Sequence, residues 1–231
     1  MDGIIDAHHH IWRLDDLEWL KGPTQPRIFG NYESIKQDYL IRDFKKDVES
    51  AGVEKSVYIQ VNWPSNEELA EAEWVQSISN ETGWPHAIIG YVDFTTQDSV
   101  TNLEKLNKFP LMRGIRQQLH WHENPQYCFQ PTPDLMNQTE WRNNFSYLQE
   151  YGWSFELQVF TSQMKDAARF ATNFTDTPMI LQHCGMPEDT SKTGIHAWKE
   201  GMVRLSECPN IHCKFSGLGT FIHRNDASFI A

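Results

Sequence analysis

The sequence has 231 residues, 39% of them hydrophobic and 13% aromatic, a composition that suits one large buried core and excludes a disordered chain. Its net charge is −11 and its basic residues do not cluster, so neither nucleic acid nor an anionic membrane is expected as a partner. Apolar runs are too short to cross a bilayer, and the start MDGIID lacks the basic region of a signal peptide. We expect a single cytoplasmic domain over residues 1–231, with its four cysteines reduced.

Seven apolar runs predict β-strands, and segments with helical spacing lie between them. The strand-like runs are GIIDAHHHIW, KSVYIQV, HAIIGYVDF, MRGIRQQL, WSFELQV, PMILQHC and NIHCKFSG. Helices are expected over 33–51, 67–81, 99–106, from an N-cap at Thr139 to about 148, over 162–174 and over 194–207. The piece from Arg13 to Tyr32 is expected to be an irregular loop over the mouth of the fold.

Strands that alternate with helices predict parallel βα units, and the continuous apolar runs are typical of strands covered on both faces. A doubly wound open sheet and a (β/α)8 barrel both satisfy this pattern. Because no glycine-rich nucleotide loop follows any strand, and polar residues follow strand after strand, we favour the α/β barrel of (β/α)8 type.

Three consecutive histidines end the first predicted strand. Side chains alternate along a strand, so His8 and His10 are expected to share a face and His9 to point the other way. His183 closes another predicted strand, in LQHCG. Imidazole is a common ligand of zinc and related ions, so the three histidines could converge on one metal ion or one substrate oxygen. The alternatives are separate hydrogen-bonded histidines in a core or, for the run itself, a purification tag.

The phrases IDAHHHIW, GIRQQLHWHENP, LQHCGMP and CKFSGL resemble the strand-end motifs of the amidohydrolase-related family. More narrowly, they are similar to its lactonase-like branch, which includes sugar lactonases and pyrone-dicarboxylate lactonase. The resemblance runs through the whole sequence and implies a (β/α)8 barrel that opens a small lactone by attack of water on the ring carbonyl. It implies catalytic roles for His8, His10, His183 and Arg116, and either no cofactor or one divalent metal such as Zn²⁺ on the three histidines.

Other polar and aromatic residues near strand ends are candidates for contacts to a small-molecule lactone. The guanidinium fork of Arg116 suits a carboxylate or a ring carbonyl, although a structural ion pair is the alternative. The further substrate-binding candidates are Gln60, His120, His122, Gln158, Lys214 and Trp12, with Glu156 as a possible lining residue. Each of these could equally be a satisfied polar or packing residue.

The sequence departs from the resembled pattern at its end. The family pattern has an eighth strand with a phrase like FGSD or FGSN, whose acid takes a proton from water, whereas this sequence ends at SFIA. We expect a truncated barrel with seven strands and open edges that promote self-association. Two alternatives to the lactonase remain open: a metal-dependent decarboxylase of the same superfamily, and an inactive truncated barrel that only binds ligand.

Overall fold

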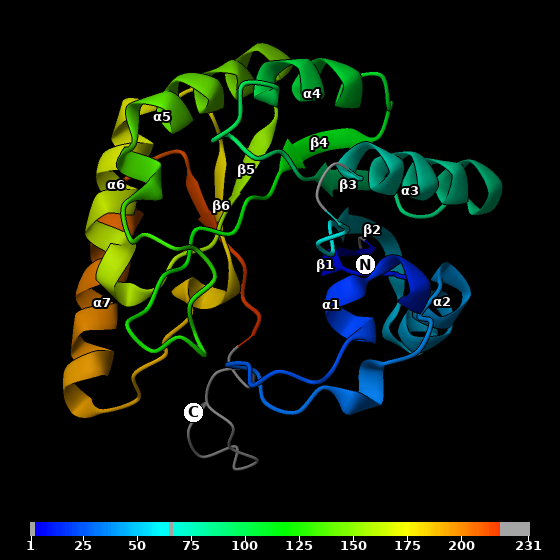
Figure 1. The fold of residues 1–231 in the computed structure, drawn as a ribbon, viewed down its shortest axis with the longest axis horizontal. Helices are drawn as coiled ribbons and strands as arrows, with labels where there is room; N and C mark the ends of the chain where they lie inside the picture. The colour runs from blue at the N-terminus through cyan, green and yellow to red at the C-terminus, as the bar shows by residue number, and fades with distance from the viewer. Residues whose placement is uncertain (1–2, 65–66, 218–231) are drawn as a thin grey trace. The chain divides into compact units, whose positions relative to one another are not determined.

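The computed structural model describes residues 3–64 and 67–217, and strands alternate with helices along the chain (Figure 1). Residue contacts divide the described residues into two compact units, one of 3–25, 32–93 and 97–116, the other of 26–31, 94–96 and 117–217. The prediction of a single domain over 1–231 stays a prediction. In the described part of the chain, no helix combines the length and the apolar character needed to span a membrane.

The first unit holds four parallel strands that lie side by side in chain order. They are β1 (Ile4–His9), β2 (Val53–Ile59), β3 (Ala87–Gly90) and β4 (Met112–Ile115). The helices of this unit are α1 (Glu18–Lys21), α2 (Ile41–Val48), α3 (Glu68–Thr82) and α4 (Ser99–Leu106). Apolar side chains of β3 such as Ile88 and Ile89 are buried, as is typical of parallel strands.

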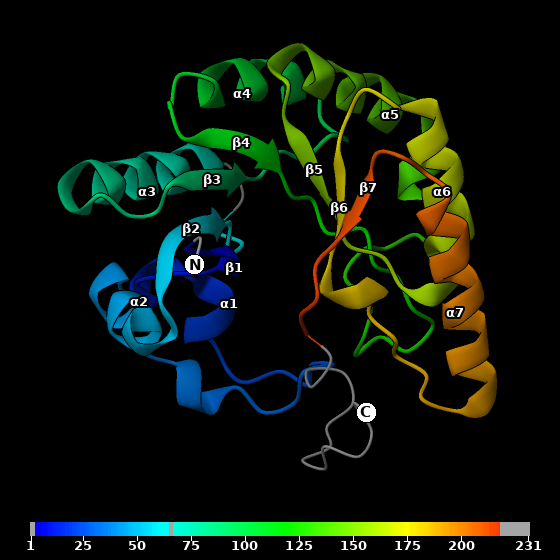
Figure 2. The ribbon, with the colours of Figure 1, turned by 180° about the vertical axis from the view of Figure 1, so that it is seen from behind.

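The second unit holds three parallel strands and three helices. The strands are β5 (Ser154–Leu157), β6 (Met179–Leu181) and β7 (Ile211–Cys213), and the helices are α5 (Thr139–Phe145), α6 (Met164–Asn173) and α7 (Lys192–Ser206). Figure 2 shows the three strands side by side, with the helices in a row along one side of them. The helix α7 begins after Ser191, whose hydroxyl accepts a hydrogen bond of 3.0 Å from the N–H of Gly194.

All seven predicted strands are present, but most end earlier than their apolar runs do. Five candidate side chains are the first residues after strand ends, and they are His10, Gln60, Arg116, Gln158 and Lys214; Gln182 holds the same position after β6. Parallel strands end their hydrogen-bond ladders at one edge, and the residues that follow are free to present polar side chains there. Each predicted run is therefore longer than its strand, because it includes the residues that follow the carboxyl end of the strand.

Three predicted elements were wrong in their bounds or kind. The expected helix over 33–51 begins only at Ile41, because Tyr39 pairs with Trp12 in an antiparallel bridge and the Leu40 N–H donates to the Asp43 carboxylate at 2.9 Å. The expected irregular loop over 13–32 contains a 3₁₀ turn and α1, which bury Leu17 and Leu20. The helix α5 starts at Thr139 itself, so Gln138 occupies the N-cap position.

Self-association of the isolated chain is a prediction that follows from β1. Among the described residues β1 pairs only with β2, and the side chains of Ile4 and Ile5 are 54% and 59% exposed. An apolar edge strand with unpaired backbone groups recruits another strand. Sedimentation velocity at several concentrations should show a rising average mass, which Ile5→Lys should reduce and Val203→Lys on α7 should not. A mass independent of concentration would contradict the prediction. The tail RNDASFIA, predicted from the sequence as a segment that could cover an open edge, lies outside the described residues.

Candidate active site

The histidine run at the end of β1 places two imidazoles against each other. The Nε2 atoms of His8 and His10 are 3.2 Å apart, and the ring planes are nearly perpendicular, at 88°. The Nδ1 of His10 lies 2.7 Å from the carbonyl oxygen of Ile59, and since a carbonyl only accepts, this nitrogen carries a proton. In the tautomer of His10 that carries its one proton on Nδ1, the Nε2 presents a lone pair and accepts from the Nε2–H of His8.

The spacing of these two nitrogens suits a shared metal ion. Two imidazole nitrogens bound to one zinc ion in tetrahedral geometry lie about 3.3 Å apart. The observed 3.2 Å matches that separation, and the bond from His10 to the Ile59 carbonyl is the kind of outer contact that orients a metal-binding histidine. The pair therefore fits two ligand positions of a divalent cation. Within residues 3–64 and 67–217, no cluster of three or more His, Cys, Asp or Glu residues is placed to hold a metal.

His9 points away from this pair and belongs to the core. It is 5% exposed, and its ring stacks on Phe44 of α2 at a centroid distance of 3.9 Å. Neither ring nitrogen has a hydrogen-bond partner in the described part of the chain. Burial lowers the pKa of His9 from 6.5 to about 4, with Asp6 acting weakly in the opposite direction. His9 is therefore neutral at pH 7 and serves packing.

Gln60 and Arg116 follow β2 and β4 and hold each other. The Arg116 guanidinium donates to the carbonyl oxygen of Gln60, and the Gln60 amide donates back to the carbonyl oxygen of Arg116 at 3.2 Å. Their own backbone N–H groups continue the sheet, to Ile89 and Gly90 respectively. Both side chains are buried, so the reciprocal bonds fix the direction of the guanidinium fork.

A pocket of about 260 Å³ lies beside these groups within the first unit. Its polar lining residues are His10, Asn62 and Arg116. Its apolar lining residues are Trp12, Leu17, Trp19, Leu20, Ile35 and Val61. A concave, mostly apolar space with a few convergent polar groups is the usual form of a small-molecule site. Trp12, predicted as a substrate contact, is therefore part of a wall that also includes His10.

Glu71 on α3 is a buried carboxyl group that sequence reasoning missed. It accepts hydrogen bonds from the hydroxyl of Tyr58 at 2.8 Å and from the N–H of Val61 at 2.6 Å. Burial raises its pKa from 4.5 to about 7, while these two bonds and the charge of Arg116 act in the opposite direction. Glu71 thus fixes the backbone at Val61, which lines the pocket. No motif marks it, because it is one acidic residue in an acid-rich helix.

His9 and Glu71 should have opposite effects on the pH dependence of stability. The native pKa of His9 is depressed, so the stability from its neutral ring is present above pH 6.5 and is lost as the pH falls toward 4. The native pKa of Glu71 is raised, so its contribution is present below pH 4.5 and is lost as the pH rises through 7. Each shift corresponds to about 3 kcal/mol, so the two contributions largely offset each other between pH 4.5 and 6.5.

Single substitutions should separate the two opposing contributions to the pH dependence of the free energy of unfolding. With His9→Phe, the free energy of unfolding should fall by about 3 kcal/mol as the pH rises from 4.5 to 7, because the contribution of Glu71 is no longer offset by that of His9. With Glu71→Gln, it should rise by a similar amount between pH 4 and 6.5. Urea unfolding at a series of pH values measures both. Profiles for the two variants that have the same sign of slope would contradict the assignment.

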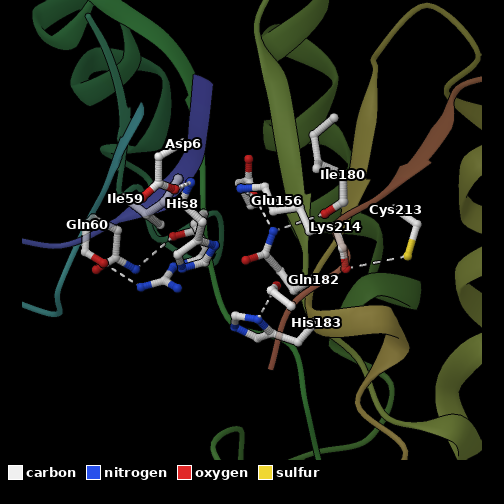
Figure 3. Close-up of polar contacts among 12 residues, drawn as sticks. Asp6, His8, Ile59, Gln60, Glu156, Ile180, Gln182, His183, Cys213 and Lys214 are labelled. Carbon is white, nitrogen blue, oxygen red and sulfur yellow. Dashed lines mark hydrogen bonds and ion pairs between the residues drawn. The ribbon is translucent and has the colours of Figure 1, made fainter. Parts of the chain in front are cut away.

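In the second unit, three strand ends meet at a buried ion pair. The Nζ of Lys214 lies 2.7 Å from the Glu156 carboxylate, and the two side chains are only 10% and 3% exposed. The amide of Gln182 donates to the same carboxylate and to the carbonyl of Ile180 at 3.3 Å (Figure 3). The predicted contact residue Lys214 is thus already paired with Glu156. Gln182 was not predicted, although it stands directly before His183 in the phrase LQHCG.

His183 stands on a strained turn after β6. The strand ends at Leu181, so the prediction that His183 closes the strand was wrong by two residues. His183, Cys184, Gly185 and Met186 all have left-handed backbone angles, with φ of 50°, 53°, 71° and 45°. Non-glycine residues rarely adopt this conformation, and such strain concentrates at functional sites.

Ser216 and Gly217 orient the imidazole of His183. The Oγ of Ser216 lies 2.9 Å from its Nδ1 (Figure 3). Gly217 has φ of 70°, and a Cβ built there would lie 2.6 Å from the Cβ of His183, so only glycine fits. Both belong to the phrase CKFSGL, which was noticed as a motif without a role for either residue.

The remaining candidates lie in loops of the second unit. His120 packs against Phe129 and Phe160, at centroid distances of 5.2 and 5.3 Å. The Nδ1 of His122 accepts a hydrogen bond of 2.8 Å from the N–H of Asn124. The amide of Gln158 donates to the sulfur of Met186 at 3.6 Å. The structure brings His8, His10, Gln60, Arg116 and Trp12 together in one unit, and it places His120, His122, Gln158, His183 and Lys214 in the other.

The chain is similar to known proteins along most of its length. A family model described as Amidohydrolase matches residues 5–231. The chain is 34% identical over 218 residues to the uncharacterised protein y4mH of Sinorhizobium fredii, covering 94% of this chain and 73% of that protein. It is 25% identical over 222 residues to an L-fucono-1,5-lactonase of Burkholderia ambifaria, covering 94% of this chain and 68% of that protein.

A solved amidohydrolase structure from Burkholderia multivorans with bound zinc has a TM-score of 0.78 and 20% identity to this chain. The match covers 98% of this chain and 75% of the other. At that identity the likeness shows the fold. The predicted α/β fold of (β/α)8-barrel type, incomplete with seven strands among the described residues, is confirmed.

Proposed function

Because the chain belongs to the amidohydrolase family, we propose that it is a hydrolase that opens a small lactone by attack of water on the ring carbonyl. The observation that carries the proposal is the His8–His10 pair, since His10 shares its pocket with the fixed guanidinium of Arg116. The 25% identity to a protein named as an L-fucono-1,5-lactonase supports a lactone as the substrate. Within this proposal the substrate is a sugar-acid lactone or a pyrone-dicarboxylate type of ring.

The two histidines can divide the proton transfers of ester hydrolysis between them. The Nε2 lone pair of His10 accepts a proton from the attacking water, since its Nδ1–H is committed to the Ile59 carbonyl, and returns it to the ring oxygen as the bond between that oxygen and the acyl carbon breaks. The Nε2–H of His8 turns from His10 to the carbonyl oxygen and stabilises the negative charge that develops on it. Arg116 binds a carboxylate or ring oxygen of the substrate and fixes its orientation.

A divalent metal is compatible with the same residues. His8 and His10 would hold it through their Nε2 atoms, and the role that the sequence predicts for His183 as a further ligand stays a prediction. When bound, such an ion polarises the carbonyl oxygen and lowers the pKa of water. The bond from His10 to Ile59 and the bond between His183 and Ser216 each fix the orientation of one imidazole, with or without the ion.

The polar residues that the sequence predicts as substrate contacts in the second unit stay proposals of their own. The Lys214 ammonium, 2.7 Å from the Glu156 carboxylate, is proposed as a contact to a substrate oxygen. Gln158 contributes an amide oxygen that is buried and has no hydrogen-bond partner within the described chain. His120 and His122 are proposed as contacts from the loop after β4.

A panel of lactones assayed by acid release, with and without chelator, tests the proposal. The panel contains glucono-1,5-lactone, dihydrocoumarin and 2-pyrone-4,6-dicarboxylate, and the matched controls are His10→Ala and the surface variant Lys199→Met. Lactonase function predicts release of one acid equivalent by the unaltered chain and by Lys199→Met, and none by His10→Ala. Loss of activity in chelator, restored by Zn²⁺, would assign the metal.

Two other outcomes would overturn the proposal in different ways. Release of CO₂ from an aromatic carboxylate without acid release from any lactone would identify a decarboxylase. If the 231-residue chain is inactive and a version extended by an eighth strand is active, the 231-residue chain is an inactive fragment that only binds ligand. In both experiments the His10→Ala variant is the control for loss of the candidate site.

A further inference from the structure

The pocket of the first unit is built for an apolar ring. It measures about 260 Å³, and its walls are the side chains of Trp12, Trp19, Leu17, Leu20 and Val61 with Ile35. A cavity of about 150 Å³ lined by apolar side chains is large enough for benzene, so this one has room for a ring and a short acyl group. The size alone admits a sugar ring as well, and the lining chemistry distinguishes the two.

The indole N–H groups of the two tryptophans in the pocket walls already donate hydrogen bonds within the protein. The indole N–H of Trp12 donates to the carbonyl of Gln37 at 2.7 Å, and that of Trp19 donates to the carbonyl of Val61 at 2.9 Å. The walls therefore present ring faces and aliphatic carbons. A sugar ring would lose water from each hydroxyl placed against them, and an unpaired hydroxyl in such a place is costly.

The polar end of the pocket suits one oxygen-bearing group. Arg116 carries a permanent positive charge, and His10 and Asn62 are the other polar residues of the lining. A carboxylate or an acyl group matches the planar guanidinium fork, and an apolar ring attached to it would reach the tryptophan walls. The pocket is thus polar at one end and apolar over the rest of its surface.

We infer that the first unit binds an aryl or similarly apolar ring joined to an acyl or carboxylate group, rather than a polyhydroxylated ring. This inference rests on the proposed function for its chemical consequence, because it narrows the proposed substrate from a sugar-acid lactone to a flat lactone ring without hydroxyls, as in the pyrone type. Binding itself does not depend on turnover. The carboxylate lies toward Arg116 and His10, and the ring lies between the apolar walls.

Calorimetric titration of the 231-residue chain with three acids tests the inference. Phenylacetate carries the apolar ring, gluconate carries hydroxyls, and acetate carries the carboxylate alone. Phenylacetate should bind at least about tenfold more tightly than either of the others, because only its ring buries apolar area against the walls. Gluconate binding that equals or exceeds phenylacetate binding, or no heat with phenylacetate at millimolar concentration, overturns the inference.

A paired variant locates the binding to this pocket. Ile35 is 37% exposed, so Ile35→Asn should fold while placing an amide in the apolar wall. It should weaken phenylacetate binding about fivefold or more and leave acetate binding unchanged. Val203→Asn on α7, at a side chain 62% exposed, is the matched control and should change neither affinity. Equal phenylacetate affinity in Ile35→Asn and Val203→Asn would show that the ring binds elsewhere.

Hydrolysis rates separate this inference from the proposed function. If phenylacetate binds as expected but no lactone is opened, the pocket assignment stands and the lactonase proposal fails. If lactones are opened, dihydrocoumarin should have a kcat/KM at least about tenfold above that of glucono-1,5-lactone. The reverse preference would overturn the inference and leave the lactonase proposal intact.

Discussion

Replacing His10 by alanine should reduce kcat/KM for lactone hydrolysis by about 10²–10⁴-fold, the usual contribution of a positioned proton acceptor. The substitution removes the Nε2 lone pair that faces His8 at 3.2 Å and the Nδ1–H that is bound to Ile59. The side chain is half-buried at the edge of the sheet, so the melting temperature should change little. Initial rates by pH-stat and a thermal melt measure the two quantities together.

The neighbouring histidine provides the control for this experiment. His9→Phe keeps the stacking on Phe44 and removes two ring nitrogens that have no hydrogen-bond partner in the described part of the chain. It should leave kcat/KM within about threefold of the unaltered chain, because His9 faces the core. If His9→Phe lowers kcat/KM as much as His10→Ala does, the assignment of faces along β1 is wrong.

Replacing Lys214 by methionine should lower the free energy of unfolding by about 3–5 kcal/mol at pH 7, the usual cost of leaving one partner of a buried ion pair alone. Glu156 is 3% exposed and loses the ammonium that lies 2.7 Å from its carboxylate. Gln182 still donates to that carboxylate but supplies no positive charge. Urea unfolding at pH 7 measures the loss.

A double substitution distinguishes the charge from the packing. The double variant Lys214→Met/Glu156→Gln removes both charges of the buried pair, so most of the lost stability should return. Lys199→Met on the exposed face of α7 is the control for the change of side chain and should cost less than about 0.5 kcal/mol. A loss below about 1 kcal/mol in Lys214→Met would show that the pair contributes little to the fold.

Much of the fold could be predicted from the sequence because its apolar runs are long and regularly spaced. The seven runs correspond to the seven strands, and helices such as α3 and α4 fall where the spacing of apolar residues indicates them. The first histidine pair was predictable for the same reason, since alternation along β1 separates His9 from His8 and His10. The first residues after the strands, such as Gln60 and Arg116, were found because polar residues stand out at the ends of apolar runs.

The residues that sequence reasoning missed depend on tertiary contacts. Glu71 becomes a buried acceptor only because the fold brings its carboxylate to the Tyr58 hydroxyl and the Val61 N–H, which lie 13 and 10 residues before it. Ser216 reaches His183 across 33 residues of chain, and no local pattern links the two. The helix expected from residue 33 starts late because Tyr39 pairs with Trp12, which helical spacing alone does not reveal.

Hydrolysis of dihydrocoumarin in ¹⁸O-labelled water is the most direct test of water attack on a lactone carbonyl. Mass spectrometry of the hydroxyacid after a single turnover should show one ¹⁸O, located in the new carboxylate, because the bond between the acyl carbon and the ring oxygen breaks. His10→Ala should yield no labelled acid above the uncatalysed background. Label on the phenolic oxygen, or no labelled acid from the unaltered chain with this or any other lactone of the panel, would contradict the account.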